Sequence, residues 1–583
     1  MYSRQTLLGV ALVVLLGCSS TDSGETGERK DTDEVTAASA ETPVLTVEPA
    51  QNPQNPPAPQ PRNEPAEVDH VAGPPRQMAN KTVLAESLLI GADASGRAEL
   101  SRIRMPSEPL DREAYSHFDT NPVHLVSESP VSTFSIDVDT ASYANVRRLL
   151  GQGVLPRHDA VRVEELVNYF SYDYPTPERA DAPFSVYTEM GPSPWHARRH
   201  LLHIGIKGYE VPEAELPPAN LVFLIDVSGS MQSPDKLGLL KSSMKMLTKR
   251  LAPEDSVAIA VYAGAAGTVL EPTPGRDRAR ILAAIDALTA GGSTNGGAGI
   301  RLAYSLAQQG FKADGINRVI LATDGDFNVG TTDTEALKNL VEEKRESGVA
   351  LTVLGFGGGN YNDALMQELA QIGNGNAAYI DTLNEARKVL VEEIGATLNM
   401  IAKDVKVQIE FNPEAVAEYR LIGYETRHLD REDFNNDAVD AGDIGAGHTV
   451  TALYEIALTG SGGALVDPLR YGPTEHRSAR STADEIAFLK LRYKLPDGET
   501  SRLITRAIDR DSIIGELNRT SDNYRFAAAV AGFGQILRGG EYTGSFDLSA
   551  AERLASAARG NDAFGYRGEF LGLVRTAEAL SGS

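Results

Sequence analysis

The sequence predicts an α/β protein in which a doubly wound, mostly parallel sheet is inserted between two β-rich regions, with helices at the C-terminal end. From 216 to 402, short apolar runs alternate with stretches whose apolar residues recur at helical spacing. This alternation is typical of a parallel sheet covered by helices on both faces. Before and after that segment, apolar residues alternate with polar ones, which is typical of half-buried strands.

Size and charge limit the possible functions. The 583 residues are too many for a single core, and the length suggests about three or four domains. There are 80 acidic and 55 basic residues, which gives a net charge of -25. Because contacts to nucleic-acid phosphates need a basic face, this balance argues against nucleic acid as a partner.

The N-terminus predicts an exported protein. Residues 1–17 contain the basic Arg4 and an apolar run at 6–16, which is too short to cross a bilayer but typical of a secretory signal. The run ends in Leu-Leu-Gly-Cys, which resembles a bacterial lipobox. That resemblance implies cleavage before Cys18 and a lipid on its thiol. The alternative is a plain signal peptide that happens to contain a cysteine.

The residues after the signal favour a lipid anchor followed by a tether. Cys18 is the only cysteine, so no disulfide can form within the chain even in an oxidising compartment. Ser19, and not an aspartate, follows it, and by analogy with Gram-negative lipoprotein sorting this favours the outer membrane. Residues 18–110 are rich in Pro, Ser and Thr and bury little apolar surface, so we expect a disordered tether.

Residues 111–215 are predicted to form a β-rich N-terminal region. The stretch VSTFSIDVDTASYANVRRLL reads as a strand followed by a helix capped by Asp139 or Thr140. Asp137 and Asp139 are also spaced to form a small oxygen site, although a strand end with a helix cap is the simpler interpretation. Alternating residues predict two more strands in APFSVYTEMG and RHLLHIGIKGYEV.

The segment 216–402 carries the parallel sheet. Its apolar runs predict strands at 221–225, 256–262, 318–323, 350–355 and 377–380. Helical spacing predicts helices near 235–250, 276–289, 297–310, 334–346, 363–371 and 383–400.

Residues 403–583 return to strand patterns and then close with helical ones. The strands are predicted in DVKVQIEFNPEAV, TVTALYEIAL, EIAFLKLRYKLPDG and ETSRLITRAI, and the helices around 521–537, 549–558 and 567–580. Neither β-rich flank looks complete alone, and exposed sheet edges need partners. We therefore expect the two flanks to pack into one sandwich-like body around the inserted sheet.

Polar side chains follow the first strand of the parallel sheet. Asp226, Ser228 and Ser230 stand at alternate positions in a turn that Gly229 makes possible. Two later loops leave the same edge: GGSTNGG carries Thr294, and LATDGD carries Asp324. Because ligands of doubly wound sheets bind at the carboxyl ends of the strands, these loops form a candidate site.

This constellation resembles the metal-ion-dependent adhesion site of von Willebrand factor type A domains over about 180 residues. The resemblance implies that Ser228 and Ser230 bind the metal directly. It implies that Thr294 binds directly or through water, and that Asp226 and Asp324 act largely through water. Without the two later loops, Asp-x-Ser-x-Ser would be explained equally well by a turn that caps the helix after it.

The donor chemistry predicts which cation binds. All five groups offer hard oxygen, which suits Mg²⁺ or Mn²⁺ and not zinc or copper. Only two of the groups are charged, so they just balance a divalent ion. We expect a protein partner to complete the coordination with the carboxylate of an Asp or Glu.

The flanks also resemble a family, the YfbK-type bacterial lipoproteins, in the stretches FSIDVDTASYANVRRLL and NYFSYDYP. The resemblance implies an envelope location and this domain architecture, and it does not imply an enzymatic activity. The sequence therefore predicts a lipid-anchored binding protein that is not an enzyme.

Two other functions fit the sequence less well. A metal-assisted hydrolase with its site in a flanking domain needs a positioned base, and no histidine lies between His203 and His428. An accessory subunit of a cytosolic ATPase conflicts with the signal sequence. The triple of His196, His200 and His203 has metal-ligand spacing only in a helix, whereas this stretch alternates like a strand.

The last helix of the inserted segment is predicted to run from 383 to 402 and to continue, after one residue, into a strand. Its apolar stripe comprises Leu383, Ala386, Leu390, Ile394, Leu398 and Ile401. By resemblance to integrin-like domains, a bound ligand could then move the C-terminal region through a nearly rigid joint. This hypothesis requires two populated states, which the sequence does not show.

Overall fold

A computed structural model describes residues 113, 115–136, 139–177, 182–212, 215–291, 296–325, 334–358, 362–393, 395, 399–467, 484–496 and 498–582. These residues all belong to one compact unit. The predicted signal peptide, Cys18, the whole tether, Asp137 and Thr294 lie outside the described residues.

The central sheet has six strands in the order β10-β9-β8-β5-β6-β7. Its bounds are β5 Ala219–Asp226, β6 Ser256–Tyr262, β7 Ala266–Pro274, β8 Ile316–Thr323, β9 Ala350–Phe356 and β10 Ala377–Ile380. Five strands are parallel, and only the edge strand β7 runs antiparallel, against β6. The predicted doubly wound sheet is thus confirmed, and β5 lies between β6 and β8 where the strand order reverses.

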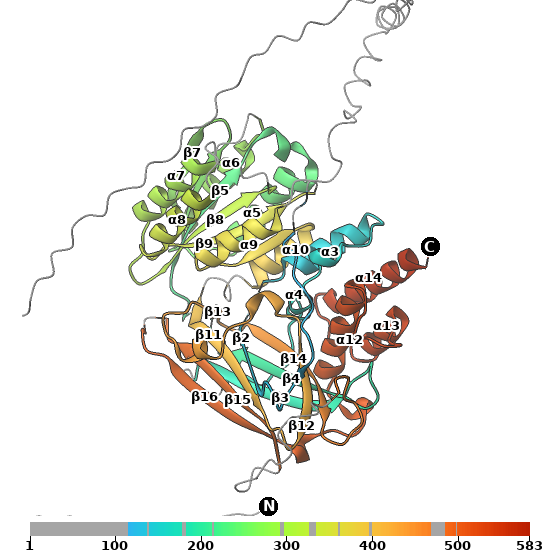
Figure 1. The fold of residues 1–583 in the computed structure, drawn as a ribbon. Coiled ribbons are helices and arrows are strands. Elements are labelled where there is room, and N and C mark those ends of the chain that lie inside the picture. Colours follow the sequence, from blue (N-terminus) through green and yellow to red (C-terminus); the bar gives the residue numbers. More distant parts are fainter. Residues whose placement is uncertain are drawn as a thin grey trace, which may run out of the picture. The chain divides into compact units, whose positions relative to one another are not determined.

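Helices cover both faces of this sheet (Figure 1). One face packs against α7 Gly296–Gln309, α8 Thr334–Arg345 and α9 Asp363–Ile372. The other packs against α5 Leu239–Thr248, α6 Arg278–Ala287 and α10 Leu383–Arg387. Alternate residues of β5 are buried on opposite faces of the sheet. Val222 and Leu224 pack with the first set of helices, and Leu221 and Phe223 pack with the second. This two-sided burial explains why the strand reads as a continuous apolar run.

The two β-rich flanks form one sandwich, as expected. One sheet has the order β1-β12-β14-β4-β3, and the other has the order β13-β11-β15-β16, with β2 also paired to β11. Strands from before and after the inserted sheet pair directly, β4 with β14 and β2 with β11. The first sheet comprises β1 His124–Leu125, β3 Phe184–Pro192, β4 His200–Gly208, β12 Val416–Ile422 and β14 Thr449–Leu458. The second comprises β2 Val131–Ser135, β11 Met400–Phe411, β13 Gly442–Gly445, β15 Glu485–Lys494 and β16 Arg502–Asp509.

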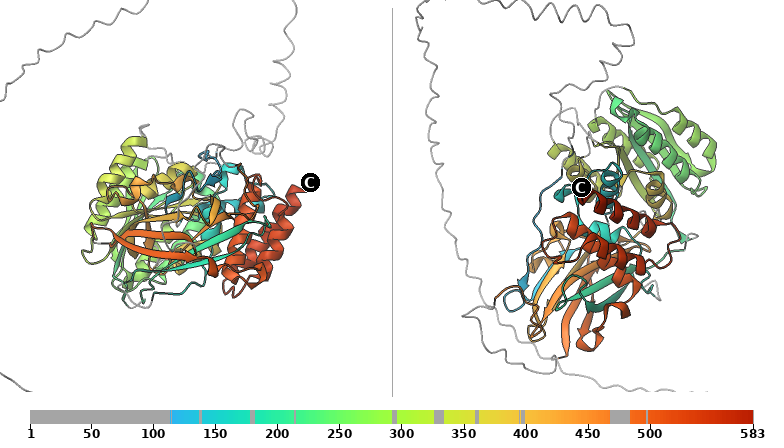
Figure 2. Two further views of the ribbon diagram at one scale, coloured as in Figure 1. Left: turned by 60° about the horizontal axis from the view of Figure 1, so that its bottom comes forward. Right: turned by 90° about the vertical axis from the view of Figure 1, so that its right-hand side faces the viewer.

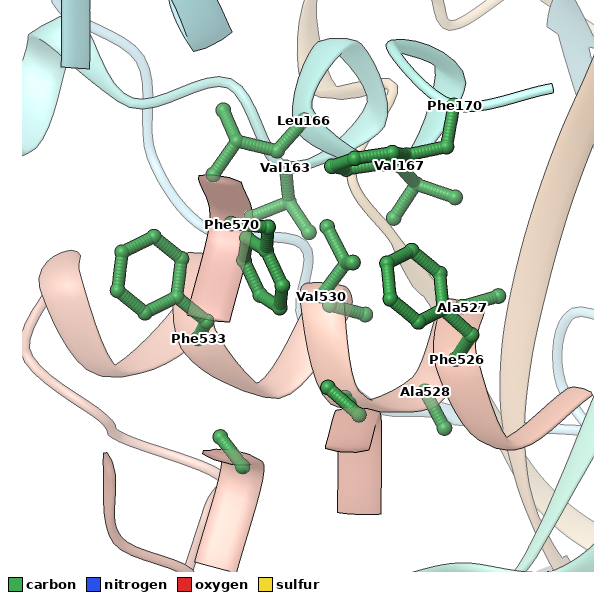
Figure 3. Packing of buried hydrophobic residues seen from close by; sticks show 14 of the residues in the cluster. Val163, Leu166, Val167, Phe170, Phe526, Ala527, Ala528, Val530, Phe533 and Phe570 are labelled. Atoms are coloured by element: carbon green, nitrogen blue, oxygen red, sulfur yellow. The ribbon is translucent and has the colours of Figure 1, made fainter. Parts of the chain in front are cut away.

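The C-terminal helices pack against the short helix α4 Val163–Asn168 of the N-terminal region. They are α12 Asp522–Leu537, α13 Leu548–Ala557 and α14 Tyr566–Ser581, drawn in red and side by side in both views of Figure 2. Figure 3 shows their shared core, in which Phe526, Phe533 and Phe570 lie against Val163, Leu166 and Phe170. The two ends of the folded chain therefore stabilise each other.

Helix α3 Ala141–Gly151 begins after Thr140, one of the two predicted cap residues, but without the side-chain hydrogen bond of a cap. Thr140 takes the N-cap position without a side-chain cap hydrogen bond. The acceptor is Glu165, whose Oε2 receives the Ser142 backbone N–H at 2.7 Å. Asp139 instead accepts the backbone N–H of Ala377 in β10 at 3.0 Å. Thr140 is thus the N-cap residue, one of the two predicted, but the capping hydrogen bond is accepted by Glu165, which tertiary packing places there.

The helix predicted over 383–402 is also wrong at its C-terminal end. α10 ends at Arg387, a π-helical turn follows at Lys388–Glu392, and β11 already begins at Met400. Within the predicted stripe, Ala386 and Leu390 are buried, but Leu383 is 48% exposed. Pairing of Met400 with Gly445 of β13 places Ile401 in a strand. Ile394 and Leu398 lie outside the described residues.

Among the helices of the described residues, none combines the length and apolar character needed to cross a membrane.

Candidate metal centre

Two carboxylates meet at the carboxyl edge of the central sheet. Asp226 is the last residue of β5, and Asp324 directly follows the end of the adjacent strand β8. Because β5 is the strand at which the sheet order reverses, both acids stand where doubly wound sheets bind ligands. Both are fully buried, at 0% exposure.

The serines that follow Asp226 bring two hydroxyl oxygens together. The Ser228 backbone N–H donates to Oδ1 of Asp226 at 2.8 Å, which fixes the turn against the strand end. The Oγ atoms of Ser228 and Ser230 are 2.9 Å apart. Adjacent ligands of an octahedral Mg²⁺, each about 2.1 Å from the ion, are separated by about 3.0 Å. The spacing of the two hydroxyls therefore fits one edge of a magnesium octahedron.

The environment of Asp226 also favours a cation. The pKa of this carboxyl is raised to about 6: burial is the largest cause and the negative charge of Asp324 also raises the pKa, whereas hydrogen bonds from Ser228 lower it. Its Oδ2 atom is buried and has no hydrogen-bond partner of good geometry among the described residues. A positive ion would stabilise such an oxygen, because burying a charge without a partner costs free energy.

Asp324 has a partner that the sequence did not reveal. The Nζ atom of Lys236 lies 2.9 Å from Oδ2 of Asp324, and the lysine side chain is only 9% exposed. Lys236 is in the π-helical turn Pro234–Gly238 that leads into α5. Nothing in the sequence pattern distinguishes this lysine from those on the surface, because its role depends on the path of a long side chain.

The chain leaves room for this lysine at Gly357. That residue follows β9 with a φ of +68°, in the left-handed region that favours glycine. A Cβ atom there would lie 2.2 Å from Cε of Lys236. The lysine stem thus packs directly on the glycine backbone.

The predicted ligands are therefore gathered as far as the structure describes them. Asp226, Ser228, Ser230 and Asp324 lie at one edge of the sheet, and their role as metal ligands stays a prediction, as does that of Thr294, which lies outside the described residues. The donor set fits a hard divalent cation, because it offers hydroxyl and carboxylate oxygens at suitable spacing.

A second charged cluster surrounds Arg147 of α3. Its Nε donates to Asp381 at 2.8 Å, and its Nη2 donates to Glu385 at 2.7 Å. Its Nη1 donates to Glu569 of α14 at 2.8 Å and to the Tyr169 hydroxyl at 2.9 Å. The arginine thus connects the α10 end of the central sheet to helices of both flanks. The sequence pattern does not reveal this cluster, because the partners are far apart along the chain.

The three histidines do not form a metal site. His200 and His203 lie in strand β4 as predicted, and His196 precedes it. His203 is fully buried, and its Nε2 lies 2.6 Å from the Tyr174 hydroxyl. Burial lowers the pKa of His203 to about 3, so it is neutral and belongs to the core.

Family models match three consecutive parts of the chain. A model described as von Willebrand factor matches residues 109–203, and one described as von Willebrand factor type A domain matches 220–392. The third, described as Uncharacterized protein YfbK, C-terminal, matches 396–580. Together they cover most of the described residues, including both flanks.

Individual proteins extend this similarity. The chain is 49% identical over 473 residues to Uncharacterized protein YfbK of Escherichia coli (strain K12), an alignment covering 80% of this chain and 81% of that protein. Inter alpha-trypsin inhibitor, heavy chain 4, of Mus musculus is 29% identical over 24% of this chain and 15% of its own length. Among solved structures, von Willebrand factor type A from Catenulispora acidiphila is 17% identical, covering 67% of this chain and 89% of that one, at a TM-score of 0.37.

Proposed function

The chain belongs to the YfbK family and carries a von Willebrand factor type A domain, and from this premise we propose that it binds another protein through a divalent cation. Type A domains generally mediate protein–protein interactions. The finer statement proposed here is that the cation is held at the carboxyl edge of the central sheet. A carboxylate of the partner then completes its coordination.

The observation that carries this proposal is the pair of hydroxyls beside two buried carboxylates. Ser228 and Ser230 place their oxygens 2.9 Å apart, next to Asp226 and on the same edge as Asp324. The hydroxyls are neutral, so the cation would keep enough positive charge to attract an anionic oxygen from outside. Mg²⁺ or Mn²⁺ suits these hard donors.

We propose binding and not catalysis at this edge. Each carboxylate already accepts a hydrogen bond from the protein. Asp226 accepts one from the Ser228 backbone N–H, and Asp324 accepts one from the ammonium of Lys236. A hydrolytic metal site needs a positioned base in addition to the metal ligands. Both acids are proposed here as ligands of the cation, and the sequence has no histidine between His203 and His428 to supply such a base.

We further propose that the protein is attached by lipid to a bacterial envelope, with the outer membrane as the expected location. The support is the sequence Leu-Leu-Gly-Cys-Ser at the end of the apolar N-terminal run. Replacing Cys18 by serine is expected to move the protein from the membrane fraction to the soluble fraction. Mass spectrometry of wild-type protein should show lipid on Cys18, and an unmodified thiol in exported protein would contradict the anchor.

The partner proposal is tested by cross-linking and affinity capture from whole cells, with Mg²⁺ present and after chelation. Proteins captured by wild type only with Mg²⁺ are the expected partners. Ser228→Ala should lose them, because the variant removes one proposed metal oxygen. Ser242→Ala is the control, since Ser242 is exposed on α5 and its hydroxyl donates only to Gly238 O. Capture unchanged by chelation and by Ser228→Ala would contradict the proposal.

A further inference from the structure

We propose that Lys236 is a built-in competitor of the metal ion: its ammonium neutralises Asp324 when the cation is absent and weakens cation binding. This inference rests on the proposed function of the site, which it deepens by naming what regulates occupancy. Its consequence is that the cation is held tightly only when a partner carboxylate binds as well.

The contact itself is close and shielded from solvent. Nζ of Lys236 is 2.9 Å from Oδ2 of Asp324, with side-chain exposures of 9% and 0%. In a buried pair the attraction is little screened by water or salt. The ammonium therefore acts on the carboxylate as a fixed charge at the proposed site.

The surrounding backbone is shaped to hold the lysine there. Gly357 lies under the side chain, where a Cβ would be 2.2 Å from Cε, 2.5 Å from Cγ and 2.8 Å from Cδ of Lys236. Tyr379 fixes this turn by donating its hydroxyl hydrogen to Gly357 O at 2.6 Å. The lysine is thus confined along most of its length and cannot swing away without leaving a gap.

The confined ammonium changes the net charge that a cation meets at the site. Asp226 and Asp324 supply two negative charges, and Lys236 returns one positive charge to the site. A divalent cation then meets a net charge of about minus one, and the loaded site keeps about one positive charge. A partner carboxylate cancels it, so cation and partner should each increase the affinity for the other.

The test is a titration of the purified full-length protein with Mg²⁺ alone. Removing the ammonium in Lys236→Met should tighten Mg²⁺ binding by about tenfold to a hundredfold, because a repelling charge is lost. Lys236→Gln, which keeps a polar side chain, should do the same. Lys245→Met is the control, since Lys245 is exposed and pairs with Asp286 away from the sheet edge.

A second readout separates competition from a merely structural role. Without metal, Lys236→Met should unfold at lower urea concentration than wild type, because Asp324 loses its contact with the lysine ammonium. Saturating Mg²⁺ should restore most of this loss. A lysine that only supports the fold would destabilise the protein equally with and without Mg²⁺, and that result would overturn the inference.

The outcomes distinguish this inference from the proposed function. If wild type and both Lys236 variants bind Mg²⁺ equally, Lys236 is not a competitor, and the cation site stands. If both Lys236 variants bind Mg²⁺ more tightly than wild type does, the competition is confirmed. If none of the proteins binds Mg²⁺, the proposed function fails and the inference fails with it.

Discussion

Replacing Arg147 by methionine is expected to lower the free energy of unfolding by about 3–5 kcal/mol. The guanidinium is 7% exposed and pairs with Asp381, Glu385 and Glu569, of which Asp381 and Glu385 are at most 5% exposed. Methionine fills much of the same volume but leaves those buried carboxylates without their cation. When one partner of a buried ion network is removed, the remaining charges stay desolvated without compensation, which destabilises the folded state.

Urea unfolding of wild type and variant measures this loss. The matched control is Arg575→Met on α14, where the arginine is 62% exposed and pairs with a partly exposed Glu552. An exposed pair contributes about 0–1 kcal/mol, so the control should unfold nearly as wild type does. Equal stability of the Arg147 variant and wild type would show that this cluster does not hold the central sheet to the flanks.

Replacing Asp226 by alanine is expected to abolish Mg²⁺ binding without unfolding the sheet. The carboxylate stands at the end of β5, and the apolar residues before it form the strand core. Burial and the charge of Asp324 already raise its pKa, which means that its ionised form is destabilised in the metal-free protein. Removing this carboxylate therefore prevents cation binding and also removes its repulsion with Asp324.

The control for this variant is Asp235→Ala, which removes an exposed acid from the turn between the serines and α5. It should bind Mg²⁺ as wild type does. Circular dichroism of metal-free Asp226→Ala should match that of wild type, and urea should unfold the variant in a cooperative transition, which shows that the sheet is still folded. A variant that has lost Mg²⁺ binding because the sheet is unfolded would not support a role for Asp226 as a ligand.

Much of the central sheet could be predicted because its strands are buried on both faces. Such strands read as continuous apolar runs, and the predicted strand at 256–262 has the observed bounds Ser256–Tyr262. Strand β7 was missed for the opposite reason. Only Leu270 and Thr273 in it are buried, so no apolar run marks it.

Strand β12 was missed because buried polar residues interrupt its apolar pattern. Glu418 and Arg420 of this strand are both buried. Glu418 forms an ion pair with Arg199, and Arg420 forms one with Glu455 at 3.3 Å. Charged residues are almost never fully buried unless they are paired. A pairing with a residue more than 200 positions away cannot be inferred from local periodicity.

The candidate site was likewise predictable only in part. The positions of Asp226, Ser228, Ser230 and Asp324 follow from strand ends and a turn, which local sequence marks well. Lys236 was not predictable, because its placement depends on Gly357 in a loop after another strand. The end of the 383–402 segment was mispredicted because pairing with β13 outweighs helical spacing at Met400 and Ile401.

The most direct test of the account is isothermal titration calorimetry of Mg²⁺ into purified wild-type protein and into Asp226→Ala. The account predicts about one Mg²⁺ per chain in wild type, as expected for a single octahedral site, and no binding in the variant. Absence of binding in wild type under conditions where the protein is folded, or equal affinity in both proteins, would contradict it.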